Sequence, residues 1–171
     1  MTWAMGQRRR ACLRWSLWLL ILLWAAVVYR FSAQTGDASD RTSNGVIRFL
    51  LLWLDGSFAG LDPEAQLARI GVWSFFVRKL AHFSLYAALG VLAFGAFSLG
   101  RWPHRAYPLA LGLGALLAAF DEAHQAFVPG RTAELRDVGI DLAGVALGAA
   151  ALLLIVTVVS KRRQRKGSKS T

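Results

Sequence analysis

The 171-residue chain is nearly free of cysteine: Cys12 is the only one, so neither an internal disulfide nor a cysteine-based metal cluster can form. It also lacks the GxGxxG, P-loop, HExxH and GxSxG patterns that mark several nucleotide-binding and hydrolytic sites. Charged residues are scarce, at 18% against about a quarter in soluble domains. This argues against a soluble nucleic-acid-binding protein, despite a formal net charge of +10, and against a largely disordered chain.

Long hydrophobic runs are what the chain has instead, since 56% of its residues are apolar. Four runs approach the roughly 20 residues that a helix needs to cross a bilayer. They cover about 13–31, 77–99, 106–128 and 138–160. We predict an all-α integral membrane bundle of four transmembrane helices over residues 13–160, with basic, disordered tails at 1–12 and 161–171. The first run could also be a signal peptide, but Phe31 stands where cleavage needs a small residue, which favours a retained helix.

Basic residues are divided unevenly between the two sides of this bundle. One side comprises the N-terminus, the loop between the second and third runs, and the C-terminal tail, and it holds twelve Lys and Arg and no acid. The other side holds eight Lys and Arg and all ten acids. Since Lys and Arg are enriched in cytoplasmic loops, we predict a multi-pass protein of the cytoplasmic membrane with both termini inside.

The longest outer segment, residues 32–76, is expected to be a loop that contains short interfacial helices. Residues 46–54 form an apolar run, broken by Arg48, that is too short to cross a membrane and is typical of a helix in the interface. Asp62 and Pro63 resemble an N-cap and a first helical residue, which predicts a second short helix ending near Gly71.

Ionisable residues inside transmembrane segments are costly and are therefore candidates for function. Here they gather near the outer leaflet, because the outer end of every span carries polar residues. These are Ser32 and Gln34 after the first span, Lys79, His82 and Tyr86 in the second, Asp121, Glu122 and Gln125 in the third, and Asp137 and Asp141 in the fourth. Spacings of three or four residues put members of a span on neighbouring positions of one helical face. Gly144 and Gly148 continue the last stripe and favour close helix contact.

Two helix N-termini point to this level, and with Lys79 and Arg131 they predict an anion site, for which lipid phosphate is the most available ligand. The four acids of the third and fourth spans could balance these cations, bind a divalent cation through oxygen, or act as acid and base. No cofactor is predicted, and no residue is assigned as a metal ligand.

Structural interpretations of the same residues stay open. Lys79 could simply extend to the interface, and Tyr86 could belong to an aromatic belt. His82 could be a core histidine that is hydrogen-bonded to a carboxylate. The acids and Arg131 could form a closed ion-pair network that fixes the helix register.

Two motifs resemble the signature of the VanZ-like family of small bacterial membrane proteins: Lys79-x-x-His82-Phe-x-x-Tyr86 and Asp121-Glu-x-x-Gln125-x-x-x-Pro-Gly-Arg131. The resemblance covers about residues 29–150. The chain departs from the family pattern at Leu85, where the family often has Glu, and at Asp141, where it often has Asn. The family's named member is linked to low-level resistance to teicoplanin, a glycopeptide that acts on the cell-wall precursor outside the membrane.

The resemblance and the outer position of the polar residues leave three hypotheses. The first is a binding or accessory protein that holds an anionic lipid or a cell-wall lipid precursor and so contributes to glycopeptide resistance. The second is an enzyme acting on a lipid phosphate or acyl group, with His82, Glu122 or Asp121 as acid or base and Tyr86 orienting the substrate or donating a proton. The third is a scaffold or a small transporter. Nucleic acid is not an expected partner, and the oligomeric state is left open. The residues expected to bind the ligand are Ser32, Gln34, Lys79, Gln125, Arg131, Asp137 and Asp141.

Overall fold

The computed structural model describes the backbone of residues 2–167 and the side chains of residues 6–162, 164 and 165, and all regular structure in that range is helical. The elements are α1 (Thr2–Ser32), α2 (Gly36–Leu54), η1 (Phe58–Gly60), α3 (Pro63–Ser98), η2 (Pro103–Arg105), α4 (Ala106–Gln125) and α5 (Leu135–Gly167). Four segments are long and apolar enough to cross a membrane: Gly6–Ser32, Pro63–Ser98, Pro103–Gln125 and Leu135–Arg162. The prediction of an all-α chain with four helices of transmembrane length is confirmed.

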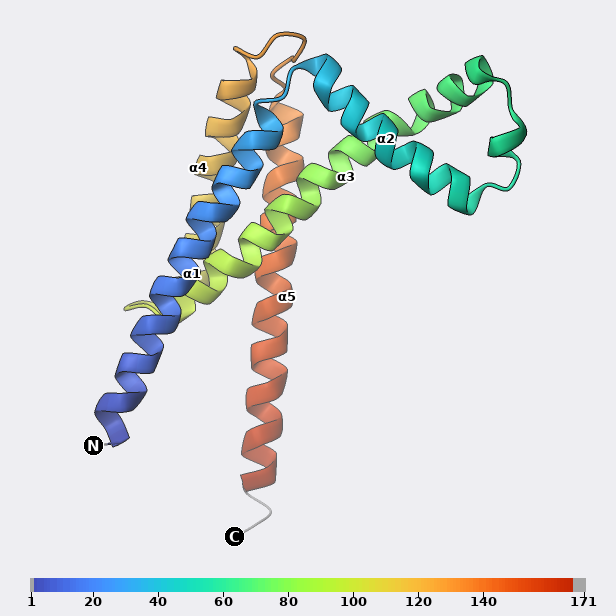
Figure 1. Cartoon of the computed structure of the whole chain (residues 1–171). Coiled ribbons are helices and arrows are strands. Elements are labelled where there is room, and N and C mark those ends of the chain that lie inside the picture. Colours follow the sequence, from blue (N-terminus) through green and yellow to red (C-terminus); the bar gives the residue numbers. More distant parts are fainter. Residues whose placement is uncertain (1, 168–171) are drawn as a thin grey trace.

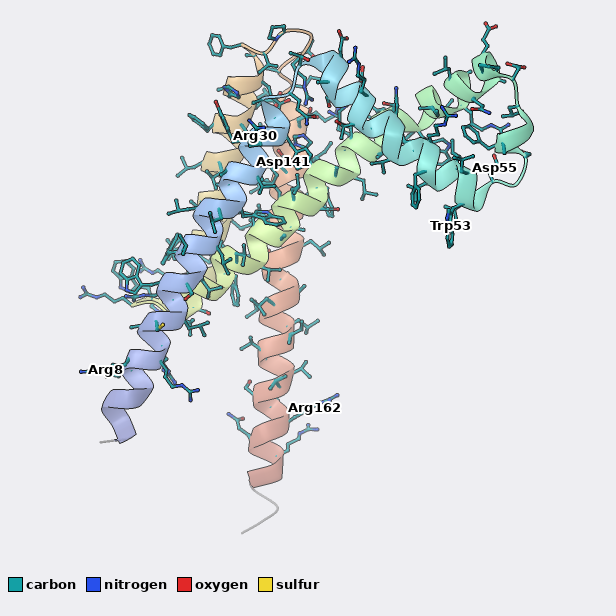
Figure 2. The ribbon with its side chains drawn as sticks, viewed as in Figure 1. Arg8, Arg30, Trp53, Asp55, Asp141 and Arg162 are labelled. Atoms are coloured by element: carbon teal, nitrogen blue, oxygen red, sulfur yellow. The ribbon has the colours of Figure 1, made fainter. Side chains whose placement is uncertain are left out.

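The helix α3 is the centre of the bundle, because it packs against α1, α4 and α5 (Figure 1). Both ends of the described chain lie at one end of the bundle, and the loop between α4 and α5 lies at the other (Figure 1). Figure 2 shows Arg8 and Arg162 at the first end, far from Arg30 and Asp141. We refer to the end that holds Arg30 and Asp141 as the polar end.

A helical hairpin projects from the side of the bundle near its polar end (Figure 1). We call it the arm, and it consists of α2, η1 and residues 63–76 of α3. Its small core is formed by Ile47, Phe58 and Ile70. At its tip, Trp53 is 80% exposed and stands beside Asp55 (Figure 2). The arm therefore has its own packing and an apolar outer surface.

Two of the helix boundaries expected for the segment 32–76 are wrong. Asp62 does cap a helix, accepting a hydrogen bond from the amide of Ala65 at 2.8 Å, but that helix does not end near Gly71 and continues to Ser98 as α3. One glycine in a helix interior costs about 1 kcal/mol relative to alanine, too little to end a long helix. The helix expected at 46–54 begins earlier, at Gly36, where Thr35 accepts a hydrogen bond from the amide of Ala38.

The tails expected to be disordered are helical wherever the structure describes them. The helix α1 begins at Thr2, and α5 continues to Gly167, while residues 168–171 lie outside the described part of the chain. Extending an existing helix adds a hydrogen bond for each residue fixed, and the Arg residues of both tails are good helix formers. The basic composition was therefore a poor guide to disorder here.

Small residues let the helices α3 and α5 approach closely. A Cβ added to Gly144 would overlap the carbonyl oxygen of Phe83, and one added to Gly148 would overlap that of Ala87. In the opposite direction, a Cβ on Gly90 of α3 would overlap the carbonyl oxygen of Val145. The predicted role of Gly144 and Gly148 in close helix contact is confirmed.

Candidate functional site

The polar residues expected at one membrane level do lie together at the polar end. They come from the end of α1, the last turns of α4, the first turns of α5 and the middle of α3. Most are buried, although each is polar or charged: Ser32, Tyr86, Asp121, Glu122, Gln125 and Asp141. Groups of this kind need partners when they leave water, so the partners decide which of them remain available for a ligand.

Asp121 joins α1 to α4. Its Oδ2 accepts a hydrogen bond from the hydroxyl of Ser32 at 2.7 Å and another from the side-chain amide of Gln125 at 3.1 Å. Gln125 is one turn after Asp121 on the same face of α4, as the sequence spacing predicted. Both donors use the same carboxylate oxygen, and they hold the orientation of the Asp121 side chain.

Lys79 joins α3 to α5. Its ammonium lies 2.5 Å from both carboxylate oxygens of Asp137 and 5.3 Å from the centre of the Phe75 ring. Both side chains of the pair are about four-fifths buried, with exposed fractions of 19% and 18%. The structure thus places Lys79 and Asp137, two expected ligand-binding residues, in an ion pair with each other.

Glu122 is engaged by the loop that precedes α5. Its carboxylate accepts a hydrogen bond from the backbone amide of Glu134, one residue before that helix begins. The side chain of Glu134 turns outward and pairs with Arg136 at 2.8 Å. This contact ties the end of α4 to the start of α5 and occupies one oxygen of a residue expected to act as acid or base.

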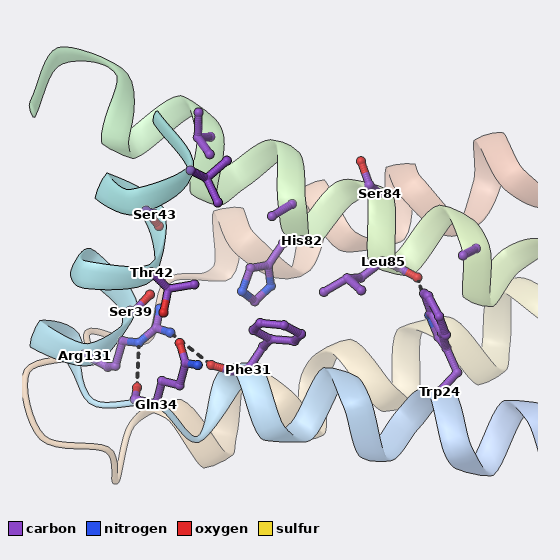
Figure 3. Close-up of a pocket in the computed structure, with 14 residues that line it drawn as sticks. Trp24, Phe31, Gln34, Ser39, Thr42, Ser43, His82, Ser84, Leu85 and Arg131 are labelled. Carbon is purple, nitrogen blue, oxygen red and sulfur yellow. Dashed lines mark hydrogen bonds between the residues drawn. The ribbon is translucent and has the colours of Figure 1, made fainter. Parts of the chain in front are cut away.

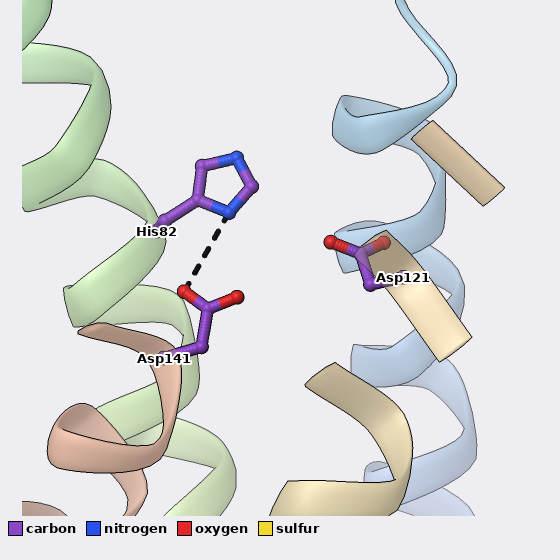
Figure 4. A group of neighbouring side chains, drawn as sticks. All are labelled: His82, Asp121 and Asp141. Atoms are coloured by element: carbon purple, nitrogen blue, oxygen red, sulfur yellow. Dashed lines mark ion pairs between the residues drawn. The ribbon is translucent and has the colours of Figure 1, made fainter. Parts of the chain in front are cut away.

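His82, Asp121 and Asp141 converge from three different helices (Figure 4). His82 Nδ1 lies 3.7 Å from Asp141 Oδ1, which is an ion-pair distance but too long for a hydrogen bond. Within the described part of the chain, Asp141 Oδ1 and the hydroxyl of Tyr86 are buried without any hydrogen-bond partner. A fully closed ion-pair network is therefore not what the structure shows.

A cavity of about 450 Å³ lies between α1, α2 and α3 (Figure 3). The polar residues of its lining are Gln34, His82 and Arg131 together with Ser39, Thr42 and Ser43 of α2. The hydroxyl of Thr42 donates to the carbonyl oxygen of Ala38 at 3.0 Å. The apolar wall of the cavity contains Trp24, Leu85 and Ala88. The indole nitrogen of Trp24 donates to the carbonyl oxygen of Leu85 at 2.8 Å, and this hydrogen bond joins α1 to α3 at the apolar wall of the cavity.

Arg131 reaches this cavity because its loop is fastened to the start of α2. The amide of Gly36 donates to the carbonyl oxygen of Pro129 at 3.1 Å, and a Cβ on Gly36 would overlap the backbone of Gly130. Gly130 has a φ of +74°, a conformation that favours glycine. The Pro-Gly-Arg sequence therefore makes the turn that brings Arg131 against α1 and α2.

Among the described residues, the guanidinium of Arg131 is hydrogen-bonded only to backbone oxygens. It donates to the carbonyl of Gln34 at 3.3 Å and, weakly, to that of Phe31 at 3.5 Å (Figure 3). No carboxylate of the described residues is within ion-pair distance of it. Burial lowers the pKa of Arg131 from its usual range, and the positive charge of Arg78 acts in the same direction. Since an arginine remains protonated in proteins, this group is a cation without a direct ion-pair partner, and the carboxylates of Asp121, Asp40 and Glu122 act on it only from a distance.

Two more hollows adjoin these residues. One, of about 250 Å³, lies between α1 and α4 and is lined by Tyr29, Tyr86 and Asp121 among others. The second is an apolar groove of about 460 Å³ between α1 and α3, and it shares Trp24 and Ala88 with the cavity. The groove extends the apolar side of the cavity along the bundle.

Sequence reasoning missed the hydroxyl groups of α2. Ser39 and Thr42, three residues apart, and Ser43, four from Ser39, face the cavity, and this spacing was the available signal. It was overlooked because residues 32–45 were expected to be loop, where side-chain periodicity has no meaning. Of the residues that the sequence analysis expected to bind the ligand, Gln34 and Arg131 line the cavity. Ser32, Gln125 and Asp137 are instead hydrogen-bonded to or paired with other side chains.

Comparison with known proteins adds a family but no characterised relative. No curated protein and no solved structure matches the chain. The model of the VanZ/LLP1 family matches residues 17–157, which include all four long helices in large part and every residue of the polar end discussed above. The chain is a multi-pass membrane protein that belongs to the VanZ/LLP1 family.

Proposed function

We propose that this membrane protein binds the anionic headgroup of a lipid, or of a lipid-linked cell-envelope precursor, in the cavity between α1, α2 and α3. The observation that carries the proposal is the combination, in one cavity, of a guanidinium without an ion-pair partner and an apolar wall. Arginine binds phosphate with charge-assisted hydrogen bonds, and the hydroxyl groups of Ser39 and Ser43 can add neutral ones. Hydrocarbon fits against Trp24 and Ala88.

The apolar groove supports an amphiphile over a free phosphate. Its lining comes from the two helices that also form the cavity's apolar wall, and Trp24 and Ala88 belong to both hollows. A lipid with its headgroup at Arg131 can therefore lay a hydrocarbon chain between α1 and α3. Burial of each methylene from water is worth about 0.8 kcal/mol, although a chain that comes from a bilayer gains little from this term.

The distribution of charge supports an outer-leaflet position for the polar end. Arg8 and Arg162 lie at the opposite end of the bundle, and the basic side of the chain is the cytoplasmic side by the positive-inside rule. With that orientation the arm lies at the outer interface, where its exposed apolar residues contact the lipid. These residues include Phe49, Trp53, Leu54, Trp73 and Phe76.

An outer-leaflet lipid site connects the protein to glycopeptide resistance. The lipid-linked precursor that such antibiotics bind is displayed on the outer face of the membrane. A protein that holds the precursor, or a lipid that surrounds it, changes what the antibiotic meets there. The resistance role is the biological part of the proposal, and the binding site is its physical part.

The test compares Arg131→Ala with Arg136→Ala. Arg136 is exposed, pairs with Glu134 and lies outside the cavity wall, so it is a matched loss of charge at the same end. Binding of phosphatidylglycerol, a polyprenyl phosphate and phosphatidylcholine to the purified protein is measured by native mass spectrometry. A charge-assisted hydrogen bond contributes about 1.5–3 kcal/mol, so Arg131→Ala should weaken binding of the two anionic lipids by about 10- to 100-fold.

Arg136→Ala should bind the lipids as the wild type does, and both of these proteins should bind phosphatidylcholine more weakly than the anionic lipids. Arg131→Ala should have lost most of this preference. Equal loss in both variants would mean that net charge, and not the cavity, attracts the lipid. Teicoplanin susceptibility of cells that carry each protein, at matched membrane levels, tests the biological part. Unchanged resistance in Arg131→Ala would reject the link between this site and resistance.

A second candidate function is an enzyme, and one observation favours it. His82 lines the cavity and has the buried carboxylate of Asp141 at 3.7 Å, an arrangement in which the acid can orient an imidazole base. The lipid-linked precursor profile distinguishes the two candidates. A species that accumulates with the wild type and disappears with His82→Gln indicates catalysis, whereas an unchanged profile with intact lipid binding indicates a binding protein.

A further inference from the structure

The group formed by His82, Asp121 and Asp141 is a second chemical centre beside the lipid cavity. Each residue offers one ligand atom, an imidazole nitrogen or a carboxylate oxygen, and the three atoms lie within 4.8 Å of one another. The residues come from α3, α4 and α5, so the group stands where three helices of the bundle meet (Figure 4).

The two carboxylates lack a cationic partner of sufficient charge. Asp121 is 4% exposed and Asp141 2% exposed, and no Lys or Arg among the described side chains is within ion-pair distance of either. Lys79, which precedes His82 by three residues on α3, is paired with Asp137. A protonated His82 would balance one of the two charges. Burying an unbalanced carboxylate is expensive, and a divalent cation would neutralise both.

An unpartnered atom points to where the cation would lie. Asp141 Oδ1 is buried without a hydrogen-bond partner, and it faces His82 Nδ1. Asp121 is oriented by Ser32 and Gln125, which both donate to its Oδ2. Metal-binding carboxylates are commonly held by donors of this kind, which fix the ligand before the ion arrives.

We propose that His82, Asp121 and Asp141 bind a divalent transition-metal ion, with Zn²⁺ and Mn²⁺ as the best matches. One imidazole and two carboxylates form a mixed nitrogen and oxygen set that suits both ions. Bonds of about 2.0–2.2 Å place tetrahedral ligand atoms roughly 3.3 Å apart, so atoms that lie within 4.8 Å of one another need to approach by about 1.5 Å at most. Three protein ligands leave a position open, and His82 also lines the lipid cavity. The site does not depend on the lipid proposal.

The test uses the full chain in detergent, carrying a purification tag without histidine and stripped with a chelator. Zn²⁺ and Mn²⁺ are titrated separately by isothermal calorimetry, and bound metal is counted by mass spectrometry of the elements after desalting. The variants are His82→Gln, Asp121→Asn and Asp141→Asn. The matched control is Asp55→Asn, the same change at a carboxylate of the arm, which pairs with Arg69 and lies outside the group.

The wild type and Asp55→Asn should bind one equivalent of Zn²⁺ or Mn²⁺, and each of the three variants at the site should bind it at least 10-fold more weakly. Absence of metal binding by the wild type, or binding that the three variants leave unchanged, overturns the proposal. If those variants do not fold, the wild type decides alone through the Co²⁺ absorption spectrum and X-ray absorption of bound Zn²⁺. One imidazole with oxygen ligands supports the site, and a sulfur ligand or several imidazoles overturns it.

Discussion

The interfaces that α3 makes with α5 and with α1 have opposite characters. Against α5, glycines bring the two backbones into contact, and Gly90, Gly144 and Gly148 leave no room for a side chain. Against α1, large side chains such as Trp24 hold the helices apart, and two hollows remain between them. One helix therefore supplies both a rigid support and one wall of a binding cavity.

This difference shows which residues of the polar end hold helices together and which remain available to bind a ligand. The ion pair of Lys79 and Asp137 continues the tight interface with α5. Arg131 and the α2 hydroxyl groups lie across the open interface with α1. His82 lies between the two, facing Asp141 on α5 and lining the cavity as well.

The largest effect is expected from filling the tight interface. Gly148→Ala puts a Cβ into the carbonyl oxygen of Ala87, so the helices must separate. Overpacking of this kind costs typically 1–3 kcal/mol, and the backbone contact here leaves little room to relax. Unfolding in mixed detergent micelles, followed by circular dichroism, measures the loss.

Gly139→Ala is the control, since nothing lies within 4 Å of a Cβ at that position on the same helix. It should be neutral or stabilise by up to about 1 kcal/mol through helix propensity. Equal stability of Gly148→Ala and Gly139→Ala would contradict the distinction between the two interfaces, because α3 and α5 could then separate without a loss of stability.

Filling the open interface should change binding more than stability. Ala88→Phe puts a ring where the cavity and the apolar groove meet. It should weaken binding of phosphatidylglycerol by at least about 10-fold, because the ring occupies space that the lipid needs in both hollows. The apparent unfolding temperature should stay within a few degrees of the wild-type value.

Ala151→Phe, on an exposed position of α5, controls for the added ring. Native mass spectrometry and a thermal shift assay provide the two readouts. A large loss of stability in Ala88→Phe, with binding intact, would mean that the α1–α3 interface is closed in the membrane.

The sequence was sufficient for the features that depend on hydropathy and on spacing within one helix. Four membrane-crossing helices follow from apolar runs, and the shared faces of His82 with Tyr86 and of Asp121 with Gln125 follow from helical periodicity. The cavity was out of reach, because it depends on Gly36 meeting Gly130 across 94 positions of the chain. Such a contact leaves no periodic signal.

The sequence also could not divide the polar residues into engaged and available ones. Lys79 and Arg131 looked equivalent as anion ligands, yet one faces Asp137 and the other only backbone oxygens. Spacing places a side chain on a face but says nothing of the distance to another helix. The same reason hid the convergence of His82, Asp121 and Asp141, which belong to three helices.

A smaller effect is expected from the hydrogen bond that crosses the open interface. Trp24→Phe removes the donor to the carbonyl oxygen of Leu85 but keeps an aromatic ring, and it should cost about 1 kcal/mol of stability. Trp18→Phe is the control, because Trp18 makes an edge-to-face contact with Phe97 that a phenyl ring can retain. Unfolding in mixed micelles compares them. A much larger cost for Trp24→Phe would show that this single bond, and not the bulk of α1, holds the helices together.

The smallest effect is expected at the tip of the arm, which takes part in neither interface. Hydrogen bonds from Ser57 lower the pKa of Asp55, and Arg69, whose guanidinium lies 2.6 Å from the carboxylate, adds to the shift. Because the folded-state pKa lies below the unfolded value of about 3.9, this contribution is present above that pH and is lost as the pH falls through the folded-state value. Asp55→Asn should therefore match the wild type at low pH and be slightly less stable at neutral pH, as hydrogen exchange of the arm can measure. If Asp55→Asn instead weakened lipid binding in the cavity, the tip of the arm would be energetically coupled to the α1–α3 interface, contrary to this prediction.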